Sequence, residues 1–233
     1  RIVSFPQVTS KWVKVFLKDF QKNITEEWSD SIPIYFIRHF KTNLNDGTYL
    51  GQGRSPSIDT ASNLEKINEP ASKLYSSPMR RCVETAKTLF HEMKIVTDDR
   101  LLEFNYGKAE GLSYKQLVSK YPKISTGWKN GEDPRFPKGE NTYDVYGRIT
   151  SFLDDLAQNI KNTQSGPICI VTHNGVLRCI IGKAFGLNLN EWYKLVIPHG
   201  IKLEFLYWQN RFYPNISRTL WFKIFQNIGY TES

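Results

Sequence analysis

The pattern of apolar and polar positions along the chain predicts several short, buried β-strands. The predicted strands cover residues 34–37, 73–76, 167–172, 201–207 and 212–216. Two of them, residues 34–37 (IYFI) and 167–172 (PICIVT), are continuous apolar runs, which are typical of strands covered on both faces. Residues 201–207 alternate between apolar and polar positions, so we expect them to pair with residues 212–216 through a turn at Gln209 and Asn210.

Helical periodicity predicts amphipathic segments around these strands. They cover residues 10–22, 78–90 and 114–120, a long helix that opens at residues 140–142 and runs to Ile160, and a helix that begins just after His173 and stops at Gly186. Ser77 is the expected N-cap of the second helix, with Pro78 at its first position. Residues 43–63 are rich in Gly, Asn, Ser and Asp, which predicts a long loop, and long loops tend to carry function.

Charged and polar side chains follow the two buried strands at the points where these strands end. Arg38 and His39 follow the first strand, and His173 ends the second. In open α/β sheets, ligands bind beyond the carboxyl ends of the strands. Either histidine alone is expected to be a satisfied structural residue, but the pair beside Arg38 indicates a functional site. Thr42 and Asn45 add polar groups beside the first strand end.

Two further side chains are candidates for chemistry. Arg81 lies in the first turn of the second helix, and an arginine at a helix N-terminus suits an anion; the alternative is a solvated arginine. Glu103 lies among apolar neighbours, which suits a general acid, and the alternative is a surface carboxylate in a loop. Glu110 is the rival candidate for the same role.

Composition and charge narrow the choice of partners. The chain has 233 residues and a formal net charge of +8, which favours anionic ligands. Its lysines and arginines are spread along the chain without a block of like charges, so we expect no nucleic-acid partner. A phosphorylated small molecule also fits the positive net charge. No apolar run reaches the ~20 residues that a membrane helix needs, so we expect no membrane span. Cys82, Cys169 and Cys179 fall at apolar positions, which predicts reduced, buried thiols and a cytoplasmic protein.

The two ends of the chain differ in character from the middle. The pattern of residues 10–22 predicts a basic amphipathic helix. This helix either binds a membrane or a partner, or it is an arm that packs on the domain with its lysines in solvent. Residues 220–228 are aromatic and apolar, so we expect them to be covered by the N-terminal arm, a second subunit in a homodimer, or an upstream domain.

Five ordered segments resemble the motifs of the histidine phosphatase superfamily, in its phosphoglycerate mutase-like branch. They are Arg38-His39 with Thr42 and Asn45, residues 77–86, residues 102–112, residues 139–145 and residues 171–178. The similarity covers about residues 32–207. It implies a three-layer α/β/α sandwich around a mostly parallel central sheet. We expect an arm at residues 1–31, a histidine phosphatase domain at residues 32–216 with a cap or lid at residues 105–140, and a tail at residues 217–233.

The resemblance also implies roles for individual residues. Arg38 and Arg81 would hold the phosphoryl oxygens, and His39 would attack phosphorus and become a phosphohistidine. His173 would stabilise the transferring charge, and Glu103 would protonate the leaving oxygen. Further substrate-binding residues are expected to be Thr42, Asn45 and Asn174. This chemistry requires no metal or cofactor; a metal site at His39 and His173 is the alternative, for which no third ligand is evident.

Two residues depart from the family pattern directly after the first histidine. Phe40 replaces the family glycine, and Lys41 replaces a residue that is often glutamate. If both line the pocket, they favour a substrate with a flat or apolar part and a second anionic group. The alternative is that Phe40 packs into the core and Lys41 points into water.

The resemblance therefore predicts a phosphatase of small phosphorylated metabolites, such as sugar phosphates. A phosphoglycerate mutase-type phosphotransferase is one alternative, although the mutases of the family carry a longer insertion between the two histidines. A non-catalytic phospho-ligand-binding domain is the other, favoured by Phe40 and the extra termini and opposed by the retained Arg38, His39, Arg81, Glu103 and His173.

Overall fold

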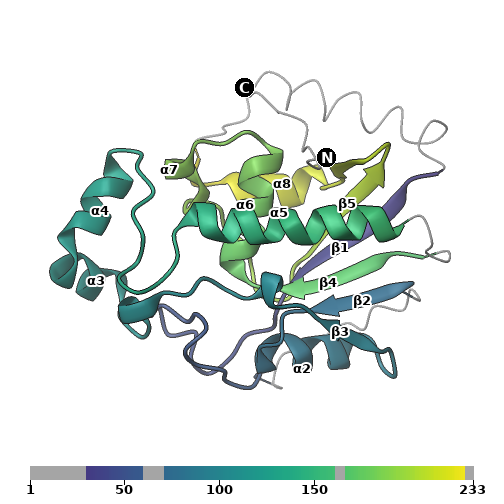
Figure 1. Cartoon of the computed structure of the whole chain (residues 1–233), viewed down its shortest axis with the longest axis horizontal. Helices are drawn as coiled ribbons and strands as arrows, with labels where there is room; N and C mark the ends of the chain where they lie inside the picture. Colours follow the sequence, from purple (N-terminus) through teal and green to yellow (C-terminus); the bar gives the residue numbers. More distant parts are fainter. Residues whose placement is uncertain (1–29, 60–70, 161–165, 229–233) are drawn as a thin grey trace.

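The computed structural model describes residues 30–59, 71–160 and 166–228 (Figure 1). Its strands are β1 (Ile32–Arg38), β2 (Lys73–Ser76), β3 (Ile95–Thr97), β4 (Ile168–Thr172), β5 (Lys202–Trp208) and β6 (Arg211–Pro214). Its α-helices are α2 (Arg80–Leu89), α3 (Tyr114–Lys120), α4 (Pro122–Lys129), α5 (Thr142–Asn159), α6 (Asn174–Ala184), α7 (Leu189–Trp192) and α8 (Arg218–Phe225). Two 3₁₀ turns, η1 (Asp99–Leu101) and η2 (Gly107–Ala109), lie between β3 and α3.

The strands form one sheet in the order β3-β2-β4-β1-β5-β6. The pairs β2–β3, β2–β4 and β1–β4 are parallel, and β5 pairs antiparallel with both β1 and β6. The carboxyl ends of β1, β2 and β4 therefore lie along one edge of the sheet. Because β5 runs in the opposite direction, the residues just before β5 lie at that same edge.

Side-chain alternation along β1 divides the core into two layers. Ile34 and Phe36 face the larger cluster, which is built with α5, α6 and α8. Tyr35 and Ile37 face the opposite side, where α2 packs. Figure 1 shows α5 and α6 on one side of the sheet and α2 on the other. The expected three-layer α/β/α fold around a mostly parallel sheet is thus confirmed.

Most of the predicted elements are present at the expected positions. The strand at Lys73–Ser76 and the helix at Tyr114–Lys120 have the predicted bounds. The hairpin turn between β5 and β6 uses Gln209 and Asn210, both with positive φ, as type I′ turns require. One prediction is wrong: α2 begins at Arg80 with Met79 as N-cap, not with Ser77. The Ser77 hydroxyl lies 2.8 Å from the ring of His173, so this side chain serves the histidine.

The segment predicted as a cap projects from one end of the sheet as α3 and α4 (Figure 1). Ser113 begins α3 with a capping box, in which its hydroxyl accepts from Gln116 N–H and the Gln116 side chain accepts from Ser113 N–H. A separate apolar cluster that includes Leu117, Ile124 and Phe136 fills the inside of this segment. The cap therefore has a small core of its own beside the main one.

The apolar tail packs against the main core of the same chain. Trp221, Ile224 and Phe225 of α8 are buried there, and Trp221 stacks on Phe225 with ring centroids 4.0 Å apart. These side chains pack against the central domain, because α8 returns to the face that carries Phe185. The N-terminal arm lies outside the described residues, and cover by a second subunit or an upstream domain stays a prediction. The predicted helix at residues 10–22 lies outside the described residues. Within the described ranges, no helix has the length and apolar character to cross a membrane.

Candidate active site

The two predicted histidines meet at the carboxyl edge of the sheet. Strands β1 and β4 are parallel neighbours, and the N–H of His39 donates to the carbonyl of Thr172 over 2.9 Å. This register brings the rings of His39 and His173 to a centroid distance of 5.2 Å. Both side chains are buried, at 3% and 0% exposure. The tertiary structure thus confirms that the two strand ends form one cluster.

His39 is held as a neutral imidazole with one defined nitrogen available. Its Nδ1 lies 2.6 Å from the Phe40 carbonyl, and since a carbonyl only accepts, Nδ1 carries the hydrogen. Nε2 is therefore the unprotonated nitrogen that can attack an electrophile. Burial, and next the charge of Arg81, lower the pKa of His39 well below its usual value. The Phe40 N–H donates to Thr85 Oγ1 of α2 over 2.9 Å, which holds this turn in place.

His173 has the opposite tautomer. Arg81 Nε lies 3.3 Å from its Nδ1, and because a guanidinium only donates, Nδ1 is the acceptor. Nε2 then carries the hydrogen and donates to Ser77 Oγ over 2.8 Å. Burial, and next the charge of Arg81, lower the pKa of His173 well below its usual value, so it is neutral as well.

Arg81 is fully buried beside His173. Its Nη1 and Nη2 donate to the carbonyls of Arg54 and Gly51 over 3.1 and 2.9 Å. Glu110 fixes this loop, since its carboxylate accepts from Gly51 N–H over 3.0 Å and pairs with Arg54 Nε at 3.2 Å. The rival candidate for the general acid is therefore an anchor of the loop that orients Arg81.

Arg38 lies on the other side of His39. Its Nη1 donates to the Ile197 carbonyl, and its Nη2 donates to Nε2 of His199 over 2.8 Å. Its Nε is buried and has no protein acceptor among the described residues. Burial is the main reason that the pKa of Arg38 falls to about 10. A buried donor without an acceptor beside a nucleophile is what a phosphoryl oxygen would satisfy.

His199 is a site residue that the sequence did not reveal. Its ring centroid lies 5.4 Å from that of His39. It precedes β5, whose antiparallel direction places it beside Arg38, whereas the pattern of the sequence points only to residues that follow strands. Burial, and next the charge of Arg38, lower the pKa of His199 to about 4. It is thus a neutral acceptor for Arg38.

Glu103 lies where the cluster of histidines and arginines meets the N-terminus of α6. Both of its carboxylate oxygens accept from Gly175 N–H over 3.1 Å, and Oε1 also accepts from Phe104 N–H over 2.9 Å. The carbonyl of Glu103 accepts from Arg148 and Gln52 over 3.0 and 2.8 Å. The carboxyl group is buried, at 4% exposure, and lies at the N-terminus of α6.

The remaining predicted residues have different surroundings. Thr42 donates from its N–H and hydroxyl to Asn45 Oδ1 over 2.7 and 3.0 Å, so the two side chains close a turn. Asn174 begins α6, and its Oδ1 is buried with no partner among the described residues. Phe40 is 5% exposed within the apolar cluster on the α2 side, while Lys41 is exposed. For these last two, the location agrees with the alternative of a core aromatic and a solvated lysine.

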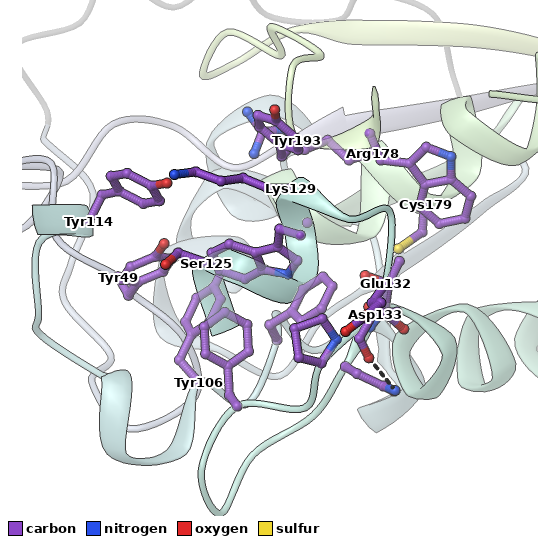
Figure 2. Close-up of a pocket in the computed structure, with 18 residues that line it drawn as sticks. Tyr49, Tyr106, Tyr114, Ser125, Lys129, Glu132, Asp133, Arg178, Cys179 and Tyr193 are labelled. Atoms are coloured by element: carbon purple, nitrogen blue, oxygen red, sulfur yellow. Dashed lines mark hydrogen bonds between the residues drawn. The ribbon is translucent and has the colours of Figure 1, made fainter. Parts of the chain in front are cut away.

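A pocket of about 310 Å³ adjoins this cluster beneath the cap (Figure 2). Its wall contains Phe104 and Gly175, the two residues whose N–H groups hold Glu103. Other parts of the wall come from α4, α6 and the segment after α7. Arg178 of α6 also lines this pocket. It lies in the motif at residues 171–178, from which no role was predicted for it.

No group of three His, Cys, Asp or Glu side chains in the described part of the chain is placed to hold a metal ion. The side chains of Cys82, Cys169 and Cys179 are buried, reduced thiols, as expected. Burial raises the pKa of the Cys82 thiol, which lies 3.3 Å from His173 Nε2.

Comparison with known proteins identifies the family. Residues 34–213 match the model of the histidine phosphatase superfamily (branch 1), which is most of the chain. The chain belongs to this superfamily, and its class is that of a phosphomonoester hydrolase. The expected resemblance is thereby confirmed, and residues 34–213 contain each of the predicted site residues.

Sequence relatives include two phosphatases. Phosphoserine phosphatase 1 of Hydrogenobacter thermophilus is 24% identical over 176 residues, which cover 70% of this chain and 80% of that protein. Metal-independent phosphoserine phosphatase of Arabidopsis thaliana is 29% identical over 175 residues, covering 66% and 72%. The crystal structure of alpha-ribazole phosphatase from Shigella flexneri has a TM-score of 0.66 at 20% identity and covers 79% of this chain and 95% of that chain. This last likeness shows a shared fold.

Proposed function

We propose that the protein hydrolyses a small phosphorylated metabolite through a phosphohistidine on His39, without a metal ion. The observation that carries the proposal is the environment of His39. Its Nδ1–H is held by a carbonyl, its Nε2 is free to attack, and arginines lie on both sides. No carboxylate of the described residues forms an ion pair with Arg38 or Arg81, so a phosphate dianion would supply the missing negative charge.

The first step would transfer the phosphoryl group to the enzyme. His39 Nε2 attacks phosphorus while the bond to the leaving oxygen breaks, and protonated Glu103 gives its proton to that oxygen. Arg38 Nε and the free N–H groups of Arg81 stabilise the negative charge on the equatorial oxygens. Nε2–H is the only N–H group of the neutral His173 ring, so it is the donor that would bind the phosphoryl oxygen when its hydrogen bond to Ser77 breaks.

The second step would release phosphate. Glu103, now a carboxylate, takes a proton from water, and the water oxygen attacks phosphorus. The N–P bond breaks, its electron pair returns to His39 Nε2, and inorganic phosphate leaves. Hydrolysis is favoured over phosphoryl return to substrate because both sequence relatives above are named as phosphatases. A purely ligand-binding role is less favoured because it does not require a free, neutral nucleophile beside a buried carboxyl.

The test is a panel of phosphomonoesters assayed for phosphate release, with and without a chelator, on the natural chain and on His39→Ala. We expect release that is insensitive to chelator and absent from His39→Ala. Rapid acid-free quench with labelled substrate should give an acid-labile phosphoenzyme on the natural chain alone. A label of equal strength on His39→Ala would overturn the assignment, and loss of activity with chelator would overturn metal independence.

A further inference from the structure

The pocket beneath the cap adjoins the group that would protonate the leaving oxygen. Gly175 lines the pocket and donates its N–H to both oxygens of Glu103, and Phe104 lines it directly after Glu103. If Glu103 gives its proton to the leaving oxygen, the rest of the leaving group extends into this pocket. Its volume of about 310 Å³ lies at the lower end of the range of small-molecule sites, which suits a ligand of one ring.

The walls of this pocket are mainly aromatic. Phe104 and Tyr106 stack with an interplanar angle of 8°, and the Tyr49 ring lies 4.9 Å from that of Tyr106. Trp128 and Phe136 extend this surface from the cap side, with ring centroids 5.6 Å apart. These side chains also form the core of the cap, but the faces that line the cavity remain open to a ligand. Flat, apolar walls favour the binding of a flat ring.

Arg178 is a charged group of the inner pocket that has unused hydrogen-bond donors. Its Nε donates to the Leu195 carbonyl over 3.0 Å, and its other four N–H groups have no acceptor in the described ranges. It forms no ion pair there either. Burial lowers the pKa of Arg178, and the side chain lies among Tyr106, Glu103 and Tyr49. A guanidinium in this position is suited to bind a carboxylate or phosphate through two parallel hydrogen bonds.

The other charged groups of the pocket do not neutralise Arg178. Asp133 accepts from the N–H groups of Thr142 and Tyr143 at the start of α5, over 3.0 Å each. Glu132 and Lys129 are exposed at the rim. Figure 2 shows Glu132 and Asp133 on a different side of the pocket from Arg178 and Tyr193. The inner part of the pocket is therefore aromatic and positive.

We propose that the leaving group of the substrate contains a flat ring with a second anionic group, a carboxylate or phosphate, which Arg178 binds. This inference rests on the proposed function, since it places the leaving group beside Glu103. It assigns to the pocket beneath the cap the selectivity for a flat anionic group that the sequence suggested for Phe40 and Lys41. In this proposal Arg178 determines specificity, because it binds an anionic group that lies about one ring away from the phosphoryl group.

The experiment compares phosphomonoesters that share a poor leaving oxygen. The probes are 4-carboxybenzyl phosphate, its uncharged amide analogue 4-carbamoylbenzyl phosphate, and the ring-free 5-carboxypentyl phosphate. On the natural chain, we expect kcat/KM for the carboxybenzyl ester to exceed that for the amide roughly 10- to 100-fold, as for a charge-assisted pair in a partly dry site. The value of kcat/KM for the carboxybenzyl ester should also exceed the value for the pentyl ester by about tenfold, because the ring contacts the aromatic walls.

The variants are Arg178→Met, which removes the charge, Arg178→Lys, which keeps it, and Lys129→Met, which removes the rim cation. The ratio of carboxybenzyl to carbamoylbenzyl turnover should fall to about one in Arg178→Met and persist in part in Arg178→Lys. If Arg178 had a purely structural role, its replacement would lower the turnover of both esters equally and leave their ratio unchanged. The assignment is overturned if Lys129→Met abolishes the ratio while Arg178→Met does not.

Inhibition of the natural chain keeps the inference testable if a variant does not fold. (4-Carboxybenzyl)phosphonate should bind roughly tenfold or more tightly than (4-carbamoylbenzyl)phosphonate. Equal inhibition together with His39-dependent hydrolysis of benzyl phosphates would overturn this inference and leave the proposed function standing. Failure of His39-dependent hydrolysis for every ester would overturn the proposed function, and this inference with it.

Discussion

The ring of Phe40 fills the space in which a side chain at position 200 would lie. A Cβ on Gly200 would be 3.0 Å from Phe40 Cδ1 and 3.1 Å from Cε1, and Gly200 has a φ of +72°, which favours glycine in any case. Phe40 itself has no positive φ. The aromatic residue that replaces the family glycine is thus accommodated by a glycine in the loop before β5, and it packs toward α2.

This packing predicts that Phe40 contributes mainly to stability. Phe40→Ala should lower the free energy of unfolding by about 3–5 kcal/mol, because it leaves a cavity beside Gly200 and the α2 face of the core. Lys41→Ala is the matched control on the next residue and should change stability by less than about 0.5 kcal/mol, because Lys41 is exposed. Urea titration of both variants checks this. A stable Phe40→Ala protein with altered substrate preference would instead place the ring in the pocket wall.

Glu103 is predicted to act on the leaving oxygen. Glu103→Gln should reduce hydrolysis of alkyl phosphates by roughly 10²–10⁴-fold and hydrolysis of 4-nitrophenyl phosphate far less, because an activated phenolate leaves without a proton. The side-chain amide of glutamine keeps the shape and can accept from Gly175 N–H through its oxygen. Steady-state kinetics on both substrate types decide the matter.

Glu110→Gln is the control for that prediction. Glu110 pairs with Arg54 and holds the loop that orients Arg81, so its loss should affect alkyl and aryl phosphates by similar factors. If the leaving-group dependence appears in Glu110→Gln and not in Glu103→Gln, the two roles are exchanged.

His199 is predicted to position Arg38. His199→Ala removes the acceptor of Arg38 Nη2 and should lower kcat/KM by roughly tenfold. His199→Gln offers an oxygen acceptor and should retain most of the natural kcat/KM. The pKa of His199 is about 4, so the neutral acceptor persists down to that pH. Below it the imidazolium repels Arg38, and the advantage of the natural chain over His199→Ala should vanish. A ratio of the two activities that is independent of pH would contradict this role.

The buried histidines predict that stability falls as pH decreases below about 6.5. Above pH 6.5, both the folded and the unfolded chain hold His39 and His173 neutral, so they contribute no pH dependence. Below it the unfolded chain binds protons that the folded chain excludes, so the free energy of unfolding falls by up to about 1.4 kcal/mol per pH unit for each histidine. Asp98 and Asp144, whose pKa values are lowered by arginine partners, add to the loss only at still lower pH.

Urea titrations between pH 7.5 and 5 measure this slope. His39→Gln should make it shallower by about one proton, because glutamine does not titrate. His91→Gln is the control, because His91 is an exposed histidine outside the site. The explanation fails if His39→Gln and the natural chain show the same slope.

The sequence by itself determined strands β1, β2, β4, β5 and β6, helices α2, α3, α5 and α6, and the two histidines at strand ends, but it predicted neither β3 nor the helices α4, α7 and α8. Continuous apolar runs such as residues 168–171 can only be covered on both faces, and the residue after such a strand must lie at the sheet edge. That local rule places His39 and His173 without any knowledge of packing. Arg81 and Glu103 were candidates from a helix start and from apolar neighbours, but only the ordered motifs implied their roles, since their surroundings in sequence also allow a solvated side chain.

The tertiary structure decided what depends on pairs of distant segments. His199 reaches Arg38 only because β5 runs antiparallel to β1, and no local pattern states the direction of a strand. The Ser77 hydroxyl bonds to the ring of His173 and does not cap α2. The fold decides this, because it brings His173, which is distant in sequence, to 2.8 Å from the hydroxyl. Phe40 packs inward because Gly200 leaves room, and Arg178 faces an aromatic pocket because the cap folds over α6. Each outcome depends on a contact between residues far apart in the chain, which the order of residues alone does not specify.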